Sequence, residues 1–564
     1  MTIESTSPGA GWRRDLLLLG VLLFVLYGFM LGCYPLGNPD EGRYAEIPRE
    51  MIETGDWVTP RLNGVKYFEK PPLVYWGGAV AMQVFGQNEW AVRLMPALCA
   101  VLGVLGTYAV GRRVYGRVAG WAAAGVLATS LLYFALGHIL LLDMPVSAFM
   151  SGTLFCFILG VREAPGGLRR ALFYGLYACA ALATLSKGLI GFLLPGAVMF
   201  VWLLVFNQWK RLRPLYLPSG LVLFFAIAAP WHLLAAQRNP DWAHFYFVRE
   251  HWLRFTTTMH GRYHPWWYFI PILLAGFIPW VGYLPQAIRS AVAGGWVRRR
   301  ENADAWFFVT WALVIFLFFS KSQSKLVPYI LPVFPPLAVL VGAWLADVAA
   351  AGQAVRLRWG LRIFAFLCGA IGVAAVVATF KTGLIRNTEQ ALALRPYAAA
   401  IAAALLIGGA LAPWLAKTRG ARAALFAQAG TMLAMLLVLA TALPHLQKPG
   451  TKPLALLYAS TARPGDRVFH YQDYFHDFTF YAACQVGSVD YPASGELGLD
   501  IDAEARASGR FIGEAEFRRQ WSAGTGRIWL LIRKEAAAAL FSDPSFHYRL
   551  QGETRKHYLV TNQP

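Results

Sequence analysis

Long apolar stretches alternate with short polar segments along most of the chain. Thirteen of these stretches approach about 20 residues, the length at which a helix spans a bilayer. The first follows Arg14 and ends near Met30. The pattern therefore predicts thirteen transmembrane helices. The other twelve stretches lie near residues 92–111, 118–137, 144–161, 171–186, 188–206, 216–236, 266–288, 305–320, 327–349, 361–380, 395–416 and 423–444.

Two apolar segments need separate interpretation. The first stretch, after Arg13 and Arg14, resembles a signal peptide, but it is longer than a usual signal core and no A-x-A cleavage site follows. We expect it to remain as a membrane helix. Residues 73–85 are apolar over only about 13 residues, too few to span. We expect these residues to form a helix that lies in the outer membrane interface.

Basic residues recur in alternate loops between the stretches. Cytoplasmic loops of membrane proteins are enriched in Lys and Arg, so we assign these loops, with Arg13 and Arg14, to the cytoplasm. We interpret the net charge of +20 as topology and attraction to anionic lipids, not as nucleic-acid binding. An odd number of spans then places the C-terminal segment outside. The basic loops are 112–117, 162–170, 210–213, 298–300, 356–362 and 417–422.

The composition excludes several classes of protein. Of 564 residues, 57% are hydrophobic and 15% are charged, whereas soluble domains carry about 25% charged residues. A water-soluble enzyme and a disordered chain are therefore excluded. The six cysteines are scattered and form no CxxC pair, which argues against a disulfide framework or a cysteine-based zinc site.

The last part of the chain has a different pattern. Residues 447–564 alternate short β-like and helix-like runs, which is typical of a small α/β domain. We interpret His470, Tyr471 and His476 as polar surface of that domain. The expected strands are 467–471, 527–532 and 557–561, and the expected helices are 503–507, 514–521 and 534–540.

These patterns define the expected fold. We predict an all-α polytopic integral membrane protein with a C-terminal soluble α/β domain. The transmembrane domain covers residues 1–446 and includes large outer loops at 36–91 and 237–265, and the α/β domain covers 447–564.

Polar residues collect in the loops assigned to the outer face. Asp40 lies just after the first span, where it is placed to cap a helix that begins near Glu41. A solvated amphipathic helix would explain the same pattern. Glu69 and Lys70 precede two prolines, which favour an extended backbone. A local ion pair is the alternative there.

Three more charged residues occur in short outer turns between predicted spans. Asp143 lies in a short turn between two spans, and a carboxylate there requires a partner or a function. Lys187 lies between the fifth and sixth spans, where the alternative is a lysine that only extends to the interface. Lys325 precedes Tyr329 on the outer face, against the positive-inside rule, which indicates anion binding. Transporters place polar residues near the membrane midplane, so this pattern favours chemistry on a lipid at the surface.

The motifs resemble a known enzyme family. The sequence NGxxYFEKPPLxYW at residues 63–76 is the most specific, and the Asp-Glu pair at 40–41 and the segments 142–143, 185–188, 249–255 and 324–329 accompany it. Together they resemble the lipid A 4-amino-4-deoxy-L-arabinose transferases. That family belongs to the protein O-mannosyltransferase-like superfamily of GT-C membrane glycosyltransferases, so a GT-C fold is expected.

The resemblance implies a reaction and a location. The donor would be undecaprenyl phosphate carrying aminoarabinose, and the acceptor would be a phosphate group of lipid A. The enzyme would be a monomer in the inner membrane of a Gram-negative cell, with its active site facing the periplasm among membrane lipids. Cells that contain its product would resist polymyxin and other cationic peptides, because the cationic sugar offsets a phosphate charge. The alternative is a protein O-mannosyltransferase or another polyprenyl-phosphate-sugar transferase with a hydroxyl acceptor. A flippase without chemistry is a further alternative.

A displacement with inversion at the anomeric carbon gives the candidate residues their roles. The leaving lipid phosphate needs fixed cations and hydrogen-bond donors. Asp40 is the first candidate for the catalytic carboxylate, with Glu41 beside it, and Asp143 would stabilise positive charge on the sugar. Glu69 and His251 are a possible pair of ligands for a divalent metal ion, with a simple hydrogen bond as the alternative. Phosphate and donor binding are assigned to Lys70, Lys187, Arg254, Lys325, Tyr329 and Tyr67.

Overall fold

The computed structural model divides into two compact units that interleave along the sequence. The first contains Met1–Leu31 and Leu94–Leu446, and the second contains Gly32–Arg93 and Gln447–Pro564. The structure describes residues 11–253, 263–380, 388–447, 450–492, 497, 503–524 and 526–563.

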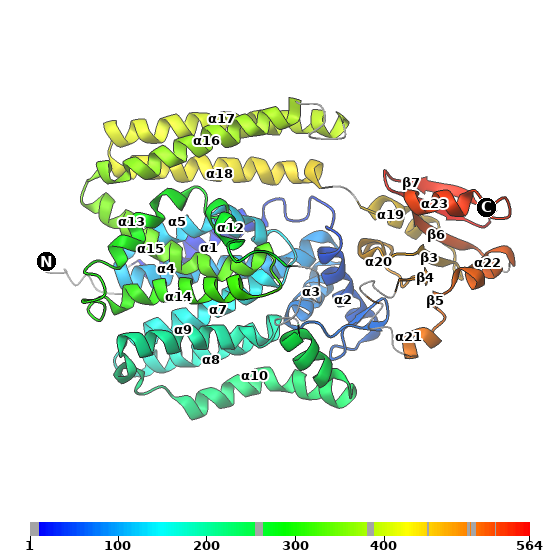
Figure 1. The fold of residues 1–564 in the computed structure, drawn as a ribbon, viewed down its shortest axis with the longest axis horizontal. Helices are drawn as coiled ribbons and strands as arrows, with labels where there is room; N and C mark the ends of the chain where they lie inside the picture. The colour runs from blue at the N-terminus through cyan, green and yellow to red at the C-terminus, as the bar shows by residue number, and fades with distance from the viewer. Residues whose placement is uncertain are drawn as a thin grey trace. The chain divides into compact units, whose positions relative to one another are not determined.

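The first unit is helical (Figure 1). Its helices α16, α17 and α18 pack side by side, as do α8, α9 and α10 with their neighbours in the bundle. The elements are α1 (Trp12–Gly28), α4 (Glu89–Tyr115, whose first turn belongs to the second unit), α5 (Arg117–Ala128), α6 (Leu131–Gly137), α7 (Asp143–Gly160), α8 (Gly167–Lys187), α9 (Ile190–Phe206), η1 (Trp209–Leu212), α10 (Leu217–Arg238), η2 (His244–Leu253), α12 (Phe269–Gly276), η3 (Trp280–Tyr283), α13 (Leu284–Ala291), α14 (Ala303–Lys321), η4 (Val327–Val333), α15 (Phe334–Ala350), η5 (Ala354–Leu357), α16 (Arg358–Phe380), α17 (Thr388–Thr418) and α18 (Ala421–Leu446).

Each of the thirteen predicted spans coincides with a helix or with a bent pair of helices. Among the described residues, eight helices are long and apolar enough to cross a membrane, or ten if two bent pairs each count as one span. The bends are 68° between α5 and α6 and 103° between α12 and the η3–α13 segment. The remaining three spans fall on α1 and α9, which have 17 residues each, and on α8, which carries three cations. The predicted polytopic helical fold is confirmed.

Small residues allow close helix packing in this unit. A Cβ added to Gly342 on α15 would lie 2.4 Å from the backbone nitrogen of Ala123 on α5. Gly111 on α4 meets Gly120 on α5 in the same way, with 3.1 Å from an added Cβ to the partner Cα. Membrane helices associate through such contacts, because lipid supplies no hydrophobic drive between them.

The second unit is built on a six-stranded mixed sheet with the order β5-β4-β3-β6-β8-β7. The pairs among β5, β4, β3 and β6 are parallel, and β8 pairs antiparallel with β6 and β7. The elements are α19 (Lys452–Thr461), β3 (Arg467–Tyr471), α20 (His476–Ala482), β4 (Gly487–Val489), α21 (Ala503–Ala507), β5 (Phe511–Ile512), α22 (Glu514–Ser522), β6 (Ile528–Arg533), α23 (Lys534–Phe541), β7 (Arg549–Glu553) and β8 (His557–Thr561).

The sequence pattern located most of these elements. Two predicted strands have the observed bounds, the third is shifted by one residue, and all three predicted helices form. The short elements α19, α20, β4, β5 and β7 were not predicted. The interpretation of His470, Tyr471 and His476 as surface is wrong, because all three are at most 6% exposed.

The segment between the first two predicted spans belongs to this second unit. It contains α2 (Asp40–Thr54), a hairpin of β1 (Arg61–Leu62) and β2 (Val65–Lys66), and α3 (Leu73–Phe85). The α3 helix confirms the predicted helix at 73–85. Asn63 and Gly64 form the hairpin turn with positive φ values of 54° and 72°, conformations that Asn and Gly tolerate best.

Helix α2 packs closely on α20 of the C-terminal segment. A Cβ on Gly42 would lie 2.8 Å from the backbone nitrogen of Asp477. The buried Asp477 carboxylate accepts hydrogen bonds from Asn38 and from the backbone and hydroxyl of Thr451. Asn63 exchanges two 2.9 Å hydrogen bonds with the backbone of Val486. Residues 32–93 and 447–564 therefore pack into one core, which contains apolar side chains and buried hydrogen bonds.

Candidate active site

In the first unit, the structure brings together three of the predicted site residues. Asp143 is the first residue of α7 and Lys187 is the last residue of α8, and their side chains form an ion pair. The Lys187 ammonium group lies 4.5 Å from the centre of the Tyr329 ring on η4. Helices α7 and α8 pack along each other, so this pairing follows from the way in which the two spans associate. Asp143 thus has the partner that its apolar surroundings require.

Lys325 lies in the turn before η4, close in sequence to Tyr329. Its side chain is buried, and its ammonium group donates hydrogen bonds to the carbonyl oxygens of His264 at 2.8 Å and Ser322 at 2.5 Å. Burial lowers the pKa of Lys325, because the charged form loses hydration. Within the described part of the chain, no carboxylate pairs with this lysine.

Unsatisfied hydroxyl groups occur in the same turn. The hydroxyl oxygens of Ser320 and Ser324 are buried and have no hydrogen-bond partner among the described residues. Buried polar groups normally have partners, so an exception calls for an explanation such as a bound ion or ligand. The segment 320–325 therefore combines an uncompensated cation with free hydroxyl groups, which suits a bound anion.

Two predicted site residues lie beyond what the structure describes. Arg254 falls in the segment that is left out, and nothing is described for the side chain of His251, whose backbone is near the end of η2. Their predicted roles in donor and metal binding stay predictions.

In the second unit, Asp40 is the first residue of α2. The helix begins one residue earlier than expected, Pro39 occupies the capping position, and no side chain caps the helix. The predicted cap by Asp40 is therefore wrong. The Asp40 carboxylate is half-exposed and lies 3.4 Å from Arg43, where the positive end of the helix dipole also favours its charge.

Glu41 is held in a buried ion pair that the sequence did not reveal. Its two carboxylate oxygens accept hydrogen bonds of 2.8 and 2.9 Å from the Arg93 guanidinium group. Arg93 also donates to the carbonyl oxygens of Tyr34 and Pro35, so the pair ties α2 to the first turn of α4. The only signal in the sequence was an arginine just inside an apolar span, where an ionised group usually has a partner.

The segment NGxxYFEKPPL, residues 63–73, is also brought against α2. Lys70 is buried and lies 3.8 Å from the Glu69 carboxylate, and its ammonium group donates to the Glu69 carbonyl oxygen at 2.7 Å. Tyr67 is buried, and its pKa is raised well above the ordinary value by that burial, with Arg43 opposing the rise. Arg43, Tyr67 and Glu69 therefore lie within electrostatic reach of one another.

Two buried carboxylates, Glu46 and Glu50, follow along α2, and the half-exposed Glu53 lies beyond them. Arg49 donates two hydrogen bonds of 2.7 and 2.8 Å to Glu46 and one to Glu53. Burial raises the pKa of Glu50, while a hydrogen bond from the Gly64 backbone opposes the rise. These contacts link α2 to the β1–β2 turn, so they hold the segment that presents Tyr67 and Lys70.

The described residues contain no group of three or more His, Cys, Asp or Glu side chains that could hold a metal ion. Glu69 lies beside Lys70, which neutralises its charge in part. The two-ligand set of Glu69 and His251 thus stays a prediction.

Each unit, taken by itself, contains groups with a recognisable chemistry. The first offers cations and hydroxyl groups suited to a phosphate, together with the Asp143 carboxylate. The second offers an accessible carboxylate, Asp40, on a helix that buried ion pairs hold in place. Such groups can bind an anionic leaving group and orient or deprotonate a nucleophile.

Known proteins resemble this chain over most of its length. Residues 69–233 match the model of the dolichyl-phosphate-mannose-protein mannosyltransferase family. An undecaprenyl phosphate-alpha-4-amino-4-deoxy-L-arabinose arabinosyl transferase from Aeromonas salmonicida is 34% identical over 397 residues, which cover 69% of this chain and 70% of that protein. The arabinosyl transferase 2 of Proteus mirabilis is 33% identical over 374 residues, 66% of each protein and thus slightly less than two thirds of the relative's length.

The similarity extends to a solved structure. The crystal structure of ArnT from Cupriavidus metallidurans bound to undecaprenyl phosphate matches with a TM-score of 0.86 and 28% sequence identity, covering 98% of both chains. This match includes the helical bundle and the mixed α/β part. The chain therefore belongs to the family of undecaprenyl phosphate-alpha-4-amino-4-deoxy-L-arabinose arabinosyl transferases.

Proposed function

We propose that the protein transfers 4-amino-4-deoxy-L-arabinose from undecaprenyl phosphate to a phosphate group of lipid A, with inversion at the anomeric carbon. The relatives carry this donor and sugar in their names, and the related crystal structure contains undecaprenyl phosphate. In the reaction, a phosphate oxygen of lipid A forms a bond to the anomeric carbon as the bond to the donor phosphate breaks.

The single observation that carries this proposal is the environment of Lys325. Among the described residues, its buried ammonium group contacts carbonyl oxygens and an aromatic ring and no carboxylate, so a positive charge lies in a poorly hydrated place. Burying an unpaired charge is costly, so a protein that retains one there needs an anion to neutralise it. The phosphate of a lipid-linked sugar donor has the required charge.

The other residues of the first unit support the departure of that phosphate. Lys187 is positioned by Asp143 and by the Tyr329 ring, and we assign it to the developing charge on the leaving group. Tyr329 would donate a hydrogen bond to the same group. Asp143 neutralises Lys187 in the absence of donor, and it would stabilise positive charge on the sugar ring or pair with its amine when the phosphate engages Lys187.

In the second unit, we assign the catalytic carboxylate to Asp40 and donor binding to Lys70 and Tyr67. Glu41 would position Asp40 through its ion pair with Arg93, because both of its oxygens are already engaged. A lipid A phosphate is largely ionised at neutral pH, so Asp40 would orient the acceptor more than remove a proton.

The proposed location is the inner membrane of a Gram-negative cell, with the reacting groups on the periplasmic side and lipid A as the second substrate. The transferred amine would offset a phosphate charge on the cell surface. Cells that contain the product would therefore bind cationic peptides such as polymyxin less strongly.

Mass spectrometry of lipid A tests the proposal directly. The full chain would be expressed in a Gram-negative strain that makes the aminoarabinose donor but lacks its own transferase. We expect lipid A with an added pentosamine in cells with the protein and none in cells without it. Donor consumption without modified lipid A would contradict the proposed acceptor.

The mannosyltransferase family model that matches residues 69–233 favours a second candidate, transfer of a lipid-linked sugar to a hydroxyl group. A hydroxyl nucleophile requires a base, so Asp40→Asn should then abolish turnover. With a phosphate acceptor, Asp40→Asn should reduce the rate only in part, about 10²-fold or less. The ratio of donor-consumption rates for Asp40→Asn and wild type, measured in native membranes that contain both kinds of acceptor, distinguishes the two.

A further inference from the structure

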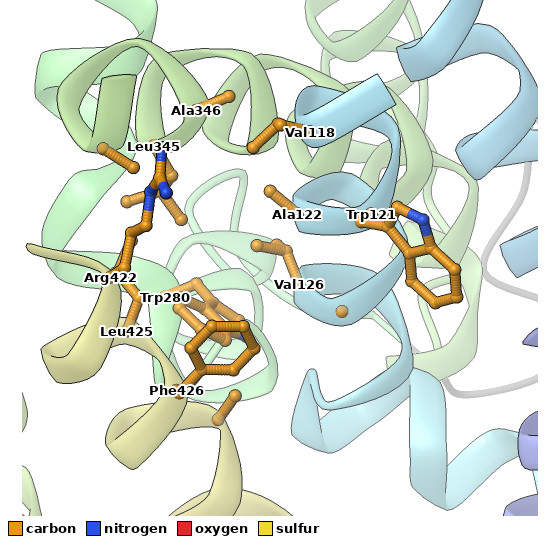
Figure 2. Close-up of a pocket in the computed structure, with 13 residues that line it drawn as sticks. Val118, Trp121, Ala122, Val126, Trp280, Leu345, Ala346, Arg422, Leu425 and Phe426 are labelled. Carbon is orange, nitrogen blue, oxygen red and sulfur yellow. The ribbon is translucent and has the colours of Figure 1, made fainter. Parts of the chain in front are cut away.

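A large apolar cavity opens onto the surface of the first unit, where its lining residues Val118 and Phe426 are exposed. It has a volume of about 660 Å³, within the range of about 300–1,000 Å³ that is typical of ligand pockets. Its walls are formed by α5, α15 and α18, and Trp280 of η3 contributes one side (Figure 2). Helix α15 packs tightly along α5 but meets α18 only lightly, which leaves the space open.

One charged side chain lines this cavity. Arg422, in the first turn of α18, reaches towards Leu345 on α15, and Val118 and Ala122 of α5 lie across from it (Figure 2). The other lining residues are apolar. Within the described part of the chain, Arg422 has no ion-pair partner. By contrast, Arg112 and Arg117 both pair with the buried Asp15.

The sequence around Arg422 is basic. Lys417 lies at the end of α17, Arg419 in the turn that follows, and Arg422 in the first turn of α18. The short helix η5, which leads into a second basic segment at 356–362, packs against α17 and α15. Several basic residues therefore lie near the place where the apolar cavity meets Arg422, and one of them, Arg356, pairs with Asp347. Basic pockets between membrane helices favour anionic lipid headgroups.

The cavity is separate from the phosphate site at Lys325. Lys325 and Tyr329 precede the first turn of α15, whereas Leu345, Ala346 and Ala349 lie in its last turns. A helix of 17 residues that rises about 1.5 Å per residue separates its ends by about 25 Å. The two sites therefore lie at opposite ends of one helix.

From these features we infer that the cavity binds an anionic bilayer phospholipid, with one acyl chain inside and its phosphate on Arg422. The apolar walls match a hydrocarbon chain, and the unpaired guanidinium group matches a phosphate, which Arg can bind in a bidentate manner. The predicted orientation places Arg422 in the cytoplasmic leaflet, where anionic phospholipids are abundant. The lipid would fill the gap between α18 and the α5–α15 pair.

Native mass spectrometry of the full chain in detergent tests whether lipid binding depends on the lipid's negative charge and on Arg422. Dioleoyl phosphatidylglycerol and dioleoyl phosphatidylcholine would be titrated separately, because they share acyl chains and differ in charge. We expect wild type to retain phosphatidylglycerol more tightly. Arg422→Gln should weaken that retention about fivefold, whereas Arg419→Gln, a control in the same turn but outside the cavity, should change it little. Equal retention of the two lipids by wild type, or equal effects of the two variants, would overturn the inference.

A second variant tests the cavity without touching the charge. A Cβ added to Gly125, which lines the cavity, meets nothing within 4 Å, so Gly125→Leu can fill the space without a clash in the backbone. We expect Gly125→Leu to reduce retention of phosphatidylglycerol at least as much as Arg422→Gln. The control is Gly369→Leu on α16, where an added Cβ also meets nothing within 4 Å. Unchanged retention in Gly125→Leu would overturn the inference, as would preferential displacement of phosphatidylglycerol by undecaprenyl phosphate.

Discussion

The two groups of site residues differ in how their cations are neutralised. In the second unit, Arg93 is fully buried and makes a bidentate ion pair with Glu41, and Arg49 pairs with Glu46 in the same manner. In the first unit, Lys325 is also buried, but the described residues around it give it carbonyl oxygens and an aromatic ring instead of a carboxylate.

This difference distinguishes charges that are neutralised within the fold from charges that a bound ligand would neutralise. A buried ion pair is satisfied within the fold, and breaking it leaves an uncompensated charge. A buried cation without a carboxylate gains most from an anion that arrives from outside. Lys187 is an intermediate case. Its ammonium group pairs with the Asp143 carboxylate, and it also lies 4.5 Å from the centre of the Tyr329 ring.

The largest expected effect concerns the structural pair. Arg93→Met should destabilise the second unit by about 3–5 kcal/mol, because the buried Glu41 carboxylate loses its partner. Hydrogen exchange of the α2 amides in the full chain measures this loss as a lower free energy of opening. The double variant Glu41→Gln with Arg93→Met should lose less, because neither charge remains unpaired.

An exposed pair in the same unit provides the control. Arg519 and Glu516 form an ion pair in which the arginine side chain is 77% exposed, and such pairs contribute about 0–1 kcal/mol. Arg519→Gln should therefore leave the opening free energies nearly unchanged. Equal losses in Arg519→Gln and Arg93→Met would contradict the structural role of the buried pair.

The next effect concerns Lys325, the charge that a bound ligand would neutralise. Lys325→Met should lower kcat/KM for transfer to lipid A about 10²–10³-fold, the usual effect of removing a group that stabilises developing charge. Stability should fall little or even rise, because the variant removes an uncompensated buried charge. Thermal unfolding in detergent, measured beside the transfer assay, shows whether the two effects separate in this way.

Lys321→Met is the matched control for that variant. Lys321 ends α14 four residues earlier and is exposed, so its charge is hydrated and should contribute little to binding of the donor phosphate. A similar loss of kcat/KM in both variants would show that overall positive charge matters, and not the buried position of Lys325.

The smallest effect is a pH dependence in the second unit. Burial lowers the pKa of His470 well below 6.5, and the neighbouring His476 and His557 add to this shift. Below about pH 6.5, the unfolded chain binds a proton that the folded chain does not, so stability is present above that pH and falls as the pH decreases. Protection of the β3 amides should therefore decrease by up to about 1.4 kcal/mol per pH unit for each such histidine.

His470→Asn keeps an acceptor for the Phe475 amide but introduces a side chain that cannot titrate. In this variant, the protection of the β3 amides against hydrogen exchange should therefore fall less at acid pH. The exposed His547 offers the control, because His547→Asn should follow the wild-type pH profile. A wild-type profile that is flat between pH 7 and pH 5 would contradict the buried neutral state of His470.

Much of the local structure was predictable from residue patterns. Each predicted apolar stretch coincides with a helix or a bent pair of helices, since a helix that faces lipid must be apolar over its length. The bounds of α3, β3, β8 and α21 match the expected segments. Among the site residues, Asp143 and Lys187 stood out because charges are rare in apolar surroundings.

The partners of those residues were not predictable. The pairing of Glu41 with Arg93 joins residues 52 positions apart, and that of Asn38 with Asp477 joins residues 439 positions apart. Hydropathy assigns a residue to membrane or water but carries no information about which segments meet. For the same reason, three histidine and tyrosine residues near β3 were expected at the surface and are buried.

The residue pattern is enough to show that the chain crosses a membrane many times, which loops are basic, and where most helices and strands form. Those properties follow from hydropathy and local periodicity, which each segment carries alone. The folded structure is needed to show that residues 32–93 and 447–564 form one unit, that Glu41 pairs with Arg93, and that Lys325 is buried without a carboxylate among the described residues. These depend on long-range packing, in which the burial and pairing of a charge are set by neighbours that lie far away in the chain.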